Sequence, residues 1–178
     1  ATIYPNAIVV HPQVPANNLQ EPIELVKKDP ARYAYGSDGN GTASHLGMEI
    51  IKARSGMVLT HVPYKGSAPM MNDLLGGTLP VGMTGLPAVQ PHLKAGKLKL
   101  AALAALSSDP DSPAARTVLE DAKTPEQRQS LEFLFAQMEI SRAIAAPPNT
   151  PQGRVEILRR GFDATTKDKE FLADAARL

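Results

Sequence analysis

Residues 33–45 are Tyr33-Ala-Tyr-Gly-Ser-Asp-Gly-Asn-Gly-Thr-Ala-Ser-His45, and they predict a strand that runs through a glycine-rich loop into a helix. The strand is expected over Tyr33–Gly36. The helix follows because apolar or glycine residues recur at helical spacing between Ala43 and Ile51, and Gly56 ends it. A strand, a short loop and a helix in this order are the repeating unit of α/β proteins.

The same unit recurs on both sides of this stretch. Further strands are expected over Ala7–Val10, Val58–Val62, Leu79–Thr84 and Leu98–Ala104. Helices are expected over Leu19–Lys28, Ser67–Leu75 and Leu86–Ala95, with Asn18 capping the first and Ser67 the second. Strands that alternate with helices over short connections predict an α/β fold with a mostly parallel sheet flanked by helices.

The last third of the chain has a different composition. A turn-rich linker covers Ser107–Pro113, a helix is expected from Pro125 to about Gln137, and Ile140–Ala146 is predicted as a strand. Thr150 is predicted to cap a helix with Pro151 in its first position, and 162–178 forms a charged amphipathic tail.

Composition excludes several classes of function. The 178 residues carry a net charge of +1 and only 4% aromatic side chains, which argues against nucleic-acid binding. Cysteine is absent, so disulfides, thiolate metal sites and cysteine nucleophiles are not available. No apolar run is long enough to span a membrane, and no signal peptide opens the chain, so the protein is cytosolic or its signal lies outside this sequence.

Three strand-to-helix junctions carry the candidate binding residues. In the first, glycines allow close approach of a ligand, and Ser37, Asn40, Thr42 and Ser44 add side-chain donors at a helix start. Pro63-Tyr-Lys-Gly-Ser-Ala-Pro69 repeats this arrangement, and Thr84-Gly-Leu-Pro87 is the third junction. Because ligands bind beyond the carboxyl ends of parallel strands, the junctions predict a shared site for a carboxylate or phosphate. The alternative is a tight turn in which Thr42 only caps its helix.

Catalysis and metal binding have weaker support. The four histidines lack metal-ligand spacing, so no metal or other cofactor is expected. A small α/β hydrolase using Ser37 or Ser67 with His45 stays open as an alternative, although no Gly-x-Ser-x-Gly motif is present. Asp38 could orient a histidine or be a turn residue. These candidate residues favour ligand recognition over catalysis. A dimerising interaction fragment is a third possibility.

Three motifs in order resemble the Bug-type solute-binding receptors of tripartite tricarboxylate transporters. They are Tyr35–His45, His61-Val-Pro-Tyr-Lys-Gly-Ser-Ala-Pro69 and Asp73-Leu-Leu-Gly-Gly77, and the likeness spans nearly the whole chain. The resemblance implies a type II periplasmic-binding-protein-like fold of two α/β domains that close over a small organic mono- or dicarboxylate. It also implies a periplasmic, non-enzymatic receptor that hands its ligand to membrane transporter subunits.

The resemblance also implies a division of the chain. Residues 1–12 would be a lead-in and first crossing strand, 13–138 the second, ligand-binding domain, and 139–178 a second crossing strand with a remnant of domain one. Most of domain one would be missing, which leaves a face through which a homodimer is possible. The binding residues carried over from the family's two junctions are Ser37, Gly39, Asn40, Gly41, Thr42, His45, Tyr64, Lys65, Gly66 and Ser67, and Thr84 is added at the third junction. The segment Thr78–Pro87 lacks the acidic residue common in the family, so the identity of the acid stays open.

Overall fold

A computed structural model describes residues 5–16, 18–29, 32–109, 112, 115–139 and 144–175. The chain divides into two compact units, Ala1–Ser141 and Arg142–Leu178.

The first unit is built on one five-stranded sheet. Its strands are β1 (Asn6–Val10), β2 (Ala34–Ser37), β3 (Thr60–Pro63), β4 (Val81–Gly85) and β5 (Lys99–Ala104), in the order β3-β2-β4-β1-β5. Strand β2 is parallel to β3 and β4, whereas β1 is antiparallel to both β4 and β5. Four strands therefore run in one direction and β1 in the other, which confirms the mostly parallel sheet.

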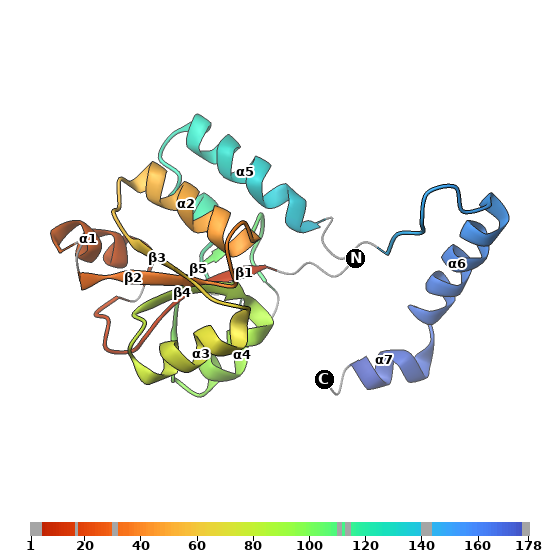
Figure 1. Ribbon diagram of the computed structural model, residues 1–178, viewed down its shortest axis with the longest axis horizontal. Coiled ribbons are helices and arrows are strands. Elements are labelled where there is room, and N and C mark those ends of the chain that lie inside the picture. The colour runs from red at the N-terminus through yellow and green to blue at the C-terminus, as the bar shows by residue number, and fades with distance from the viewer. Residues whose placement is uncertain are drawn as a thin grey trace. The chain divides into compact units, whose positions relative to one another are not determined.

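Helices cover both faces of this sheet. They are α1 (Gln20–Lys28), α2 (Ala43–Ser55), α3 (Ser67–Gly76), α4 (Leu86–Lys94) and α5 (Pro125–Glu139), with a short 3-10 helix η2 (Val118–Asp121). Figure 1 shows α1, α2 and α5 on one face and α3 and α4 on the other.

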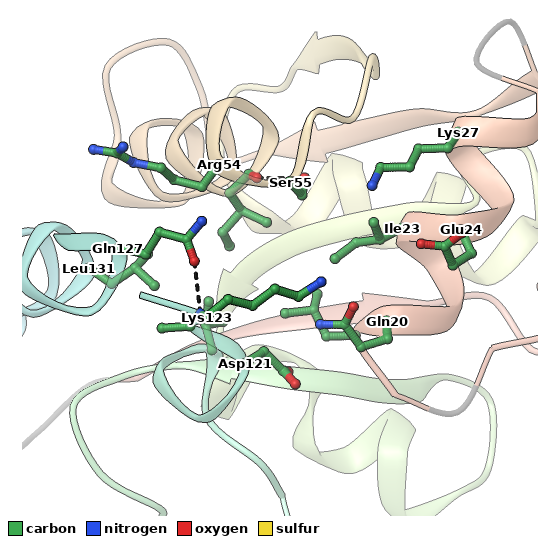
Figure 2. Close-up of a pocket in the computed structure, with 14 residues that line it drawn as sticks. Gln20, Ile23, Glu24, Lys27, Arg54, Ser55, Asp121, Lys123, Gln127 and Leu131 are labelled. Carbon is green, nitrogen blue, oxygen red and sulfur yellow. Dashed lines mark hydrogen bonds between the residues drawn. The ribbon is translucent and has the colours of Figure 1, made fainter. Parts of the chain in front are cut away.

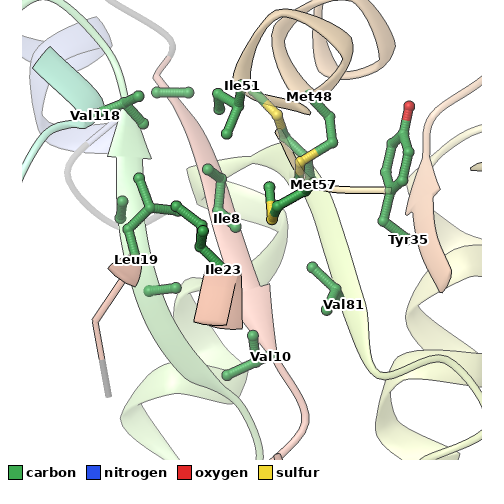
Figure 3. Close-up of a cluster of buried hydrophobic side chains, with 14 of the residues drawn as sticks. Ile8, Val10, Leu19, Ile23, Tyr35, Met48, Ile51, Met57, Val81 and Val118 are labelled. Atoms are coloured by element: carbon green, nitrogen blue, oxygen red, sulfur yellow. The ribbon is translucent and has the colours of Figure 1, made fainter. Parts of the chain in front are cut away.

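The core is divided by the sheet into two apolar clusters, because successive strand residues point to opposite faces. On β1, Ile8 and Val10 join the cluster under α1, α2 and α5, whereas Ala7 and Val9 join the cluster under α3 and α4. Figure 3 shows the first cluster, in which Met48 and Met57 fill the space between α2 and the sheet.

Helix ends follow local chemistry, with two corrections. The Asn18 side chain accepts from the amides of Gln20 and Glu21 at the start of α1, and Gly56 ends α2 in the left-handed conformation, as predicted. Ser67 does not cap α3: it is the first helical residue, and Gly66, at φ 101°, precedes it. Likewise Pro151, not Thr150, lies directly before α6 (Gln152–Thr165).

The strand predicted over Ile140–Ala146 is not present in its described part. Helix α5 continues to Glu139, and Ile144–Ala146 lie in no regular element. Residues 140–143 lie outside the described residues. The assignment of crossing strands and domain roles at residues 12 and 138 stays a prediction.

The second unit contains α6 and α7 (Lys169–Ala175), and neither helix buries a side chain. Within the described residues, no helix combines the length and the apolar character required to cross a bilayer.

Candidate ligand-binding site

The three predicted junctions lie at one edge of the sheet. Strands β3, β2 and β4 are parallel neighbours, so the loops that follow Ser37, Pro63 and Gly85 emerge side by side at their carboxyl ends. We call the residues 37–45, 64–67 and 84 the strand-end site. The structure thus brings together all eleven predicted binding residues, whereas their contact with a ligand remains a proposal.

Two backbone hydrogen bonds join the first and second junctions. The amide of Tyr64 donates to the Ser37 carbonyl, and the amide of Gly66 donates to the Asp38 carbonyl, each over 3.1 Å. Gly39 is required here, because its φ is 138° and a Cβ would lie 3.1 Å from the Tyr64 carbonyl oxygen. The two loops therefore form one continuous backbone surface.

The Asp38 side chain joins the third junction to the first. Its Oδ1 accepts from the Thr84 hydroxyl at 2.8 Å, and its Oδ2 accepts from the Ser44 hydroxyl at 3.3 Å. Burial raises the pKa of the Asp38 carboxyl, and these two hydrogen bonds oppose that rise. Sequence reasoning did not place Asp38 among the site residues, because its bond to Thr84 spans 46 positions of the chain.

Part of the first junction's hydrogen-bonding capacity is used internally. The amide of Gly39 donates to the Ser37 hydroxyl, that of Gly41 to His45 Nδ1, and that of Thr42 to the Gly39 carbonyl. Thr42 also caps α2 by accepting from the His45 amide, as the alternative interpretation predicted. Among the described residues, no acceptor pairs with the amides of Asn40, Ala43 and Ser44, which leaves the helix start able to bind an anion.

The second junction keeps its helix start open. In the described part of the chain, the amides of Ser67 and Ala68 at the start of α3 have no hydrogen-bond acceptor. Lys65 is exposed beside them. Tyr64 instead points along α3, where its hydroxyl donates to Asp73 at 2.6 Å; burial and this carboxylate raise the pKa of Tyr64 to about 12.

Three aromatic rings stack at the base of the first junction. The rings of Tyr35 and His61 are 4.8 Å apart, and those of His61 and His45 are 4.2 Å apart. The Ser37 hydroxyl lies 2.7 Å from His61 Nε2 and is completely buried. Ser37 therefore pairs with His61 and not with His45, the partner that the hydrolase alternative named, and its side chain is closed to solvent. Ser67 makes no hydrogen bond to a histidine among the described residues, so neither serine is paired with His45 as that alternative needs.

A separate cavity lies at the opposite end of α2. It has a volume of about 120 Å³ and lies between α1, the last turn of α2, η2 and α5. Figure 2 shows the side chains of Lys27 and Lys123 pointing toward this space. Because it adjoins Arg54 and Ser55, at the carboxyl end of α2, it is not part of the strand-end site. Nowhere in the described residues do three or more His, Cys, Asp or Glu side chains gather as a metal site would require.

Comparison with known proteins identifies the family. The family described as "Tripartite tricarboxylate transporter family receptor" matches residues 1–174. The chain belongs to this family. Protein BugT of Bordetella pertussis is 32% identical over 167 residues, covering 93% of this chain and 48% of BugT. The family is one of receptors, which agrees with the expectation of a binding protein that is not an enzyme.

Solved structures of periplasmic binding proteins share the fold. The structure "R. palustris Rpa4515 with adipate" matches with a TM-score of 0.64 and 28% identity, covering 75% of this chain and 50% of that chain. The periplasmic binding protein BugD matches with a TM-score of 0.63 and 26% identity, covering 78% and 52%. The chain thus has the fold of Bug-type periplasmic binding proteins, and it spans about half the length of the curated relatives that it matches.

Proposed function

We propose that this receptor chain binds a small organic mono- or dicarboxylate at the strand-end site. The observation that carries the proposal is the joined pair of junctions, where the amides of Ala43, Ser44, Ser67 and Ala68 at two helix starts lack acceptors within the described residues. A bound carboxylate would supply those acceptors and would lie at the positive ends of two helix dipoles. The adipate bound to Rpa4515, a relative of the same fold, supports this ligand class.

The expected affinity of this chain alone is low. A hydrogen bond between an amide and a carboxylate contributes about 1.5–3 kcal/mol in favourable cases. Association costs at least about 4 kcal/mol, and a site that is open to water gains less from each bond. Binding in the millimolar range, equivalent to about 4 kcal/mol, is therefore the expectation.

The proposal extends to the biological role that the family supports. The protein would act outside the cytoplasm, in the periplasm, and would pass its ligand to the membrane subunits of a tripartite transporter. Membership in the transporter receptor family supports this role.

Removal of single amides tests the site. Proline at the first position of a helix keeps the helix and removes its N–H group, so Ala43→Pro and Ser67→Pro each delete one proposed donor. Titration of C3 to C9 carboxylates, followed by amide NMR shifts, should show weaker binding by about tenfold for each proline variant. Ser67→Ala separates the hydroxyl from the amide: it keeps the amide, so it should weaken binding less than Ser67→Pro does. Binding unchanged by both prolines, or no binding of any carboxylate, would refute the proposal.

A further inference from the structure

The strand-end site contains a carboxylate, that of Asp38, that pairs with no cationic side chain among the described residues. Asp38 lies where the three junctions meet, and within the described residues its carboxylate accepts from two neutral hydroxyl groups, those of Thr84 and Ser44. No Lys, Arg or His in the described part of the chain forms an ion pair with it. A carboxylate has about four lone-pair directions, so Asp38 can accept further hydrogen bonds.

The charge of Asp38 is not needed for its structural contacts. An asparagine in the same place would accept from Thr84 through its carbonyl oxygen and donate to Ser44 Oγ through its amide group. The half-buried carboxylate is harder to keep ionised than an exposed one, which the raised pKa of Asp38 reflects. A charge that is costly and structurally dispensable at a binding site points to a role in recognition.

The site therefore offers groups of both signs. The unbonded amides of the two helix starts and the exposed side chain of Lys65 suit an anion, whereas Asp38 suits a cation. Lys65 does not neutralise Asp38, since no ion pair joins the two side chains. A ligand with a carboxylate alone would experience repulsion from Asp38, and a ligand with both groups would not.

We propose that Asp38 is a specificity-determining residue that accepts a hydrogen bond from a ligand ammonium group, so that the site prefers amino acids to carboxylic acids of the same length. This inference rests on the proposed carboxylate-binding function and names its substrate class. The ligand ammonium group lies against the Asp38 carboxylate. The ligand carboxylate accepts hydrogen bonds from the backbone amides at the starts of α2 and α3.

Matched ligand pairs test the preference in the 178-residue chain. L-aspartate is compared with succinate and L-glutamate with glutarate, by NMR titration of backbone amides. We expect each amino acid to bind about tenfold more tightly than its partner, because one charge-assisted hydrogen bond is gained. Asp38→Asn should remove this preference and strengthen succinate binding. Asp121→Asn, which removes a negative charge at the separate cavity, should leave the preference unchanged.

The outcomes separate this inference from the proposed function. Succinate binding that equals or exceeds L-aspartate binding in the wild type overturns the role of Asp38 and leaves carboxylate binding intact, and this comparison needs no variant to fold. L-malate that binds as tightly as L-aspartate also overturns it, because a neutral hydroxyl donor would then suffice. A preference that persists in Asp38→Asn has the same consequence. Failure of all compounds to bind refutes the proposed function, and the inference with it.

Discussion

At the scale of single residues, the surroundings of His61 disfavour its charged form. Burial lowers the pKa of His61 first, and the neighbouring His45 ring, 4.2 Å away, adds to this effect. Glu49 opposes the shift, whereas Lys52 reinforces it. Tyr35 on the other side of the ring is held by its hydroxyl's bond to Glu49. The neutral form of His61 is therefore favoured in the folded protein.

The lowered pKa of His61 makes the stability of the folded protein depend on pH. His61 has a lower pKa in the folded protein than its ordinary value of 6.5. At pH values between these two, the unfolded chain binds more protons than the folded chain. The free energy of unfolding should therefore rise with pH across this window and fall as the solution is acidified below 6.5. Urea unfolding from about pH 5 to 8 should show a shallower acid decline for His61→Gln than for the wild type. His92→Gln on α4 is the control; an identical decline in wild type and His61→Gln would contradict the prediction.

The glycine-rich junctions could be recognised at this scale because a local pattern encodes them. The hydrogen bonds Ser37–His61 and Thr84–Asp38 could not be predicted from a local pattern, because they join residues that are 24 and 46 positions apart. Both depend on β2 lying between β3 and β4, and strand order is not a local property.

At the scale of elements, helix α3 lies close to the sheet because glycines provide the space. A Cβ on Gly82 of β4 would lie 2.6 Å from Leu74 Cδ1, and one on Gly36 of β2 would lie 2.8 Å from Met70 Sδ, both on α3. Leu74 is completely buried. These two glycines set the distance of α3 from the sheet and hence the position of the second junction.

Substitution of Gly82 tests this packing. Gly82→Ala should lower the free energy of unfolding by about 1–3 kcal/mol, because the extra methyl group overpacks a filled core. Gly76→Ala is the matched control, since no atom lies within 4 Å of its added Cβ, and helix propensity predicts a gain of up to about 1 kcal/mol. Urea unfolding of the two variants measures the difference. Equal stability of both would show that Leu74 moves aside without cost.

Most elements of the first unit could be predicted from sequence because apolar periodicity, glycine and proline mark them locally. The reversed direction of β1 could not be predicted from sequence, because its partners β4 and β5 lie some 70 to 100 residues further along the chain. In addition, the apolar run Ala7–Val10 would suit either a parallel or an antiparallel strand. The strand predicted at Ile140–Ala146 lacks such marks, because Ser141 and Arg142 interrupt its apolar residues. A short segment of this kind does not distinguish a strand from other structures, and Ile144 is 82% exposed in the structure.

At the scale of the whole molecule, burial differs between the two units. The first unit buries large side chains on both faces of its sheet, among them Phe135, which is completely inaccessible. In the second unit, the described helices bury no side chain, and Phe162 on α6 is 55% exposed. Helices of 14 and 7 residues without a packed face are only marginally stable in water.

The two phenylalanines give a matched test of this division. Phe135→Ala should lower the free energy of unfolding by about 3–5 kcal/mol, because it removes a buried ring and leaves a cavity. Phe162→Ala should change it by no more than about 0.5 kcal/mol, as for other exposed positions. Hydrogen exchange should agree: amides of α6 should exchange through local opening, whereas those of β1 and β4 should exchange only on global unfolding. A loss of several kcal/mol in Phe162→Ala would contradict the prediction, because the ring would then have to be buried in the folded protein.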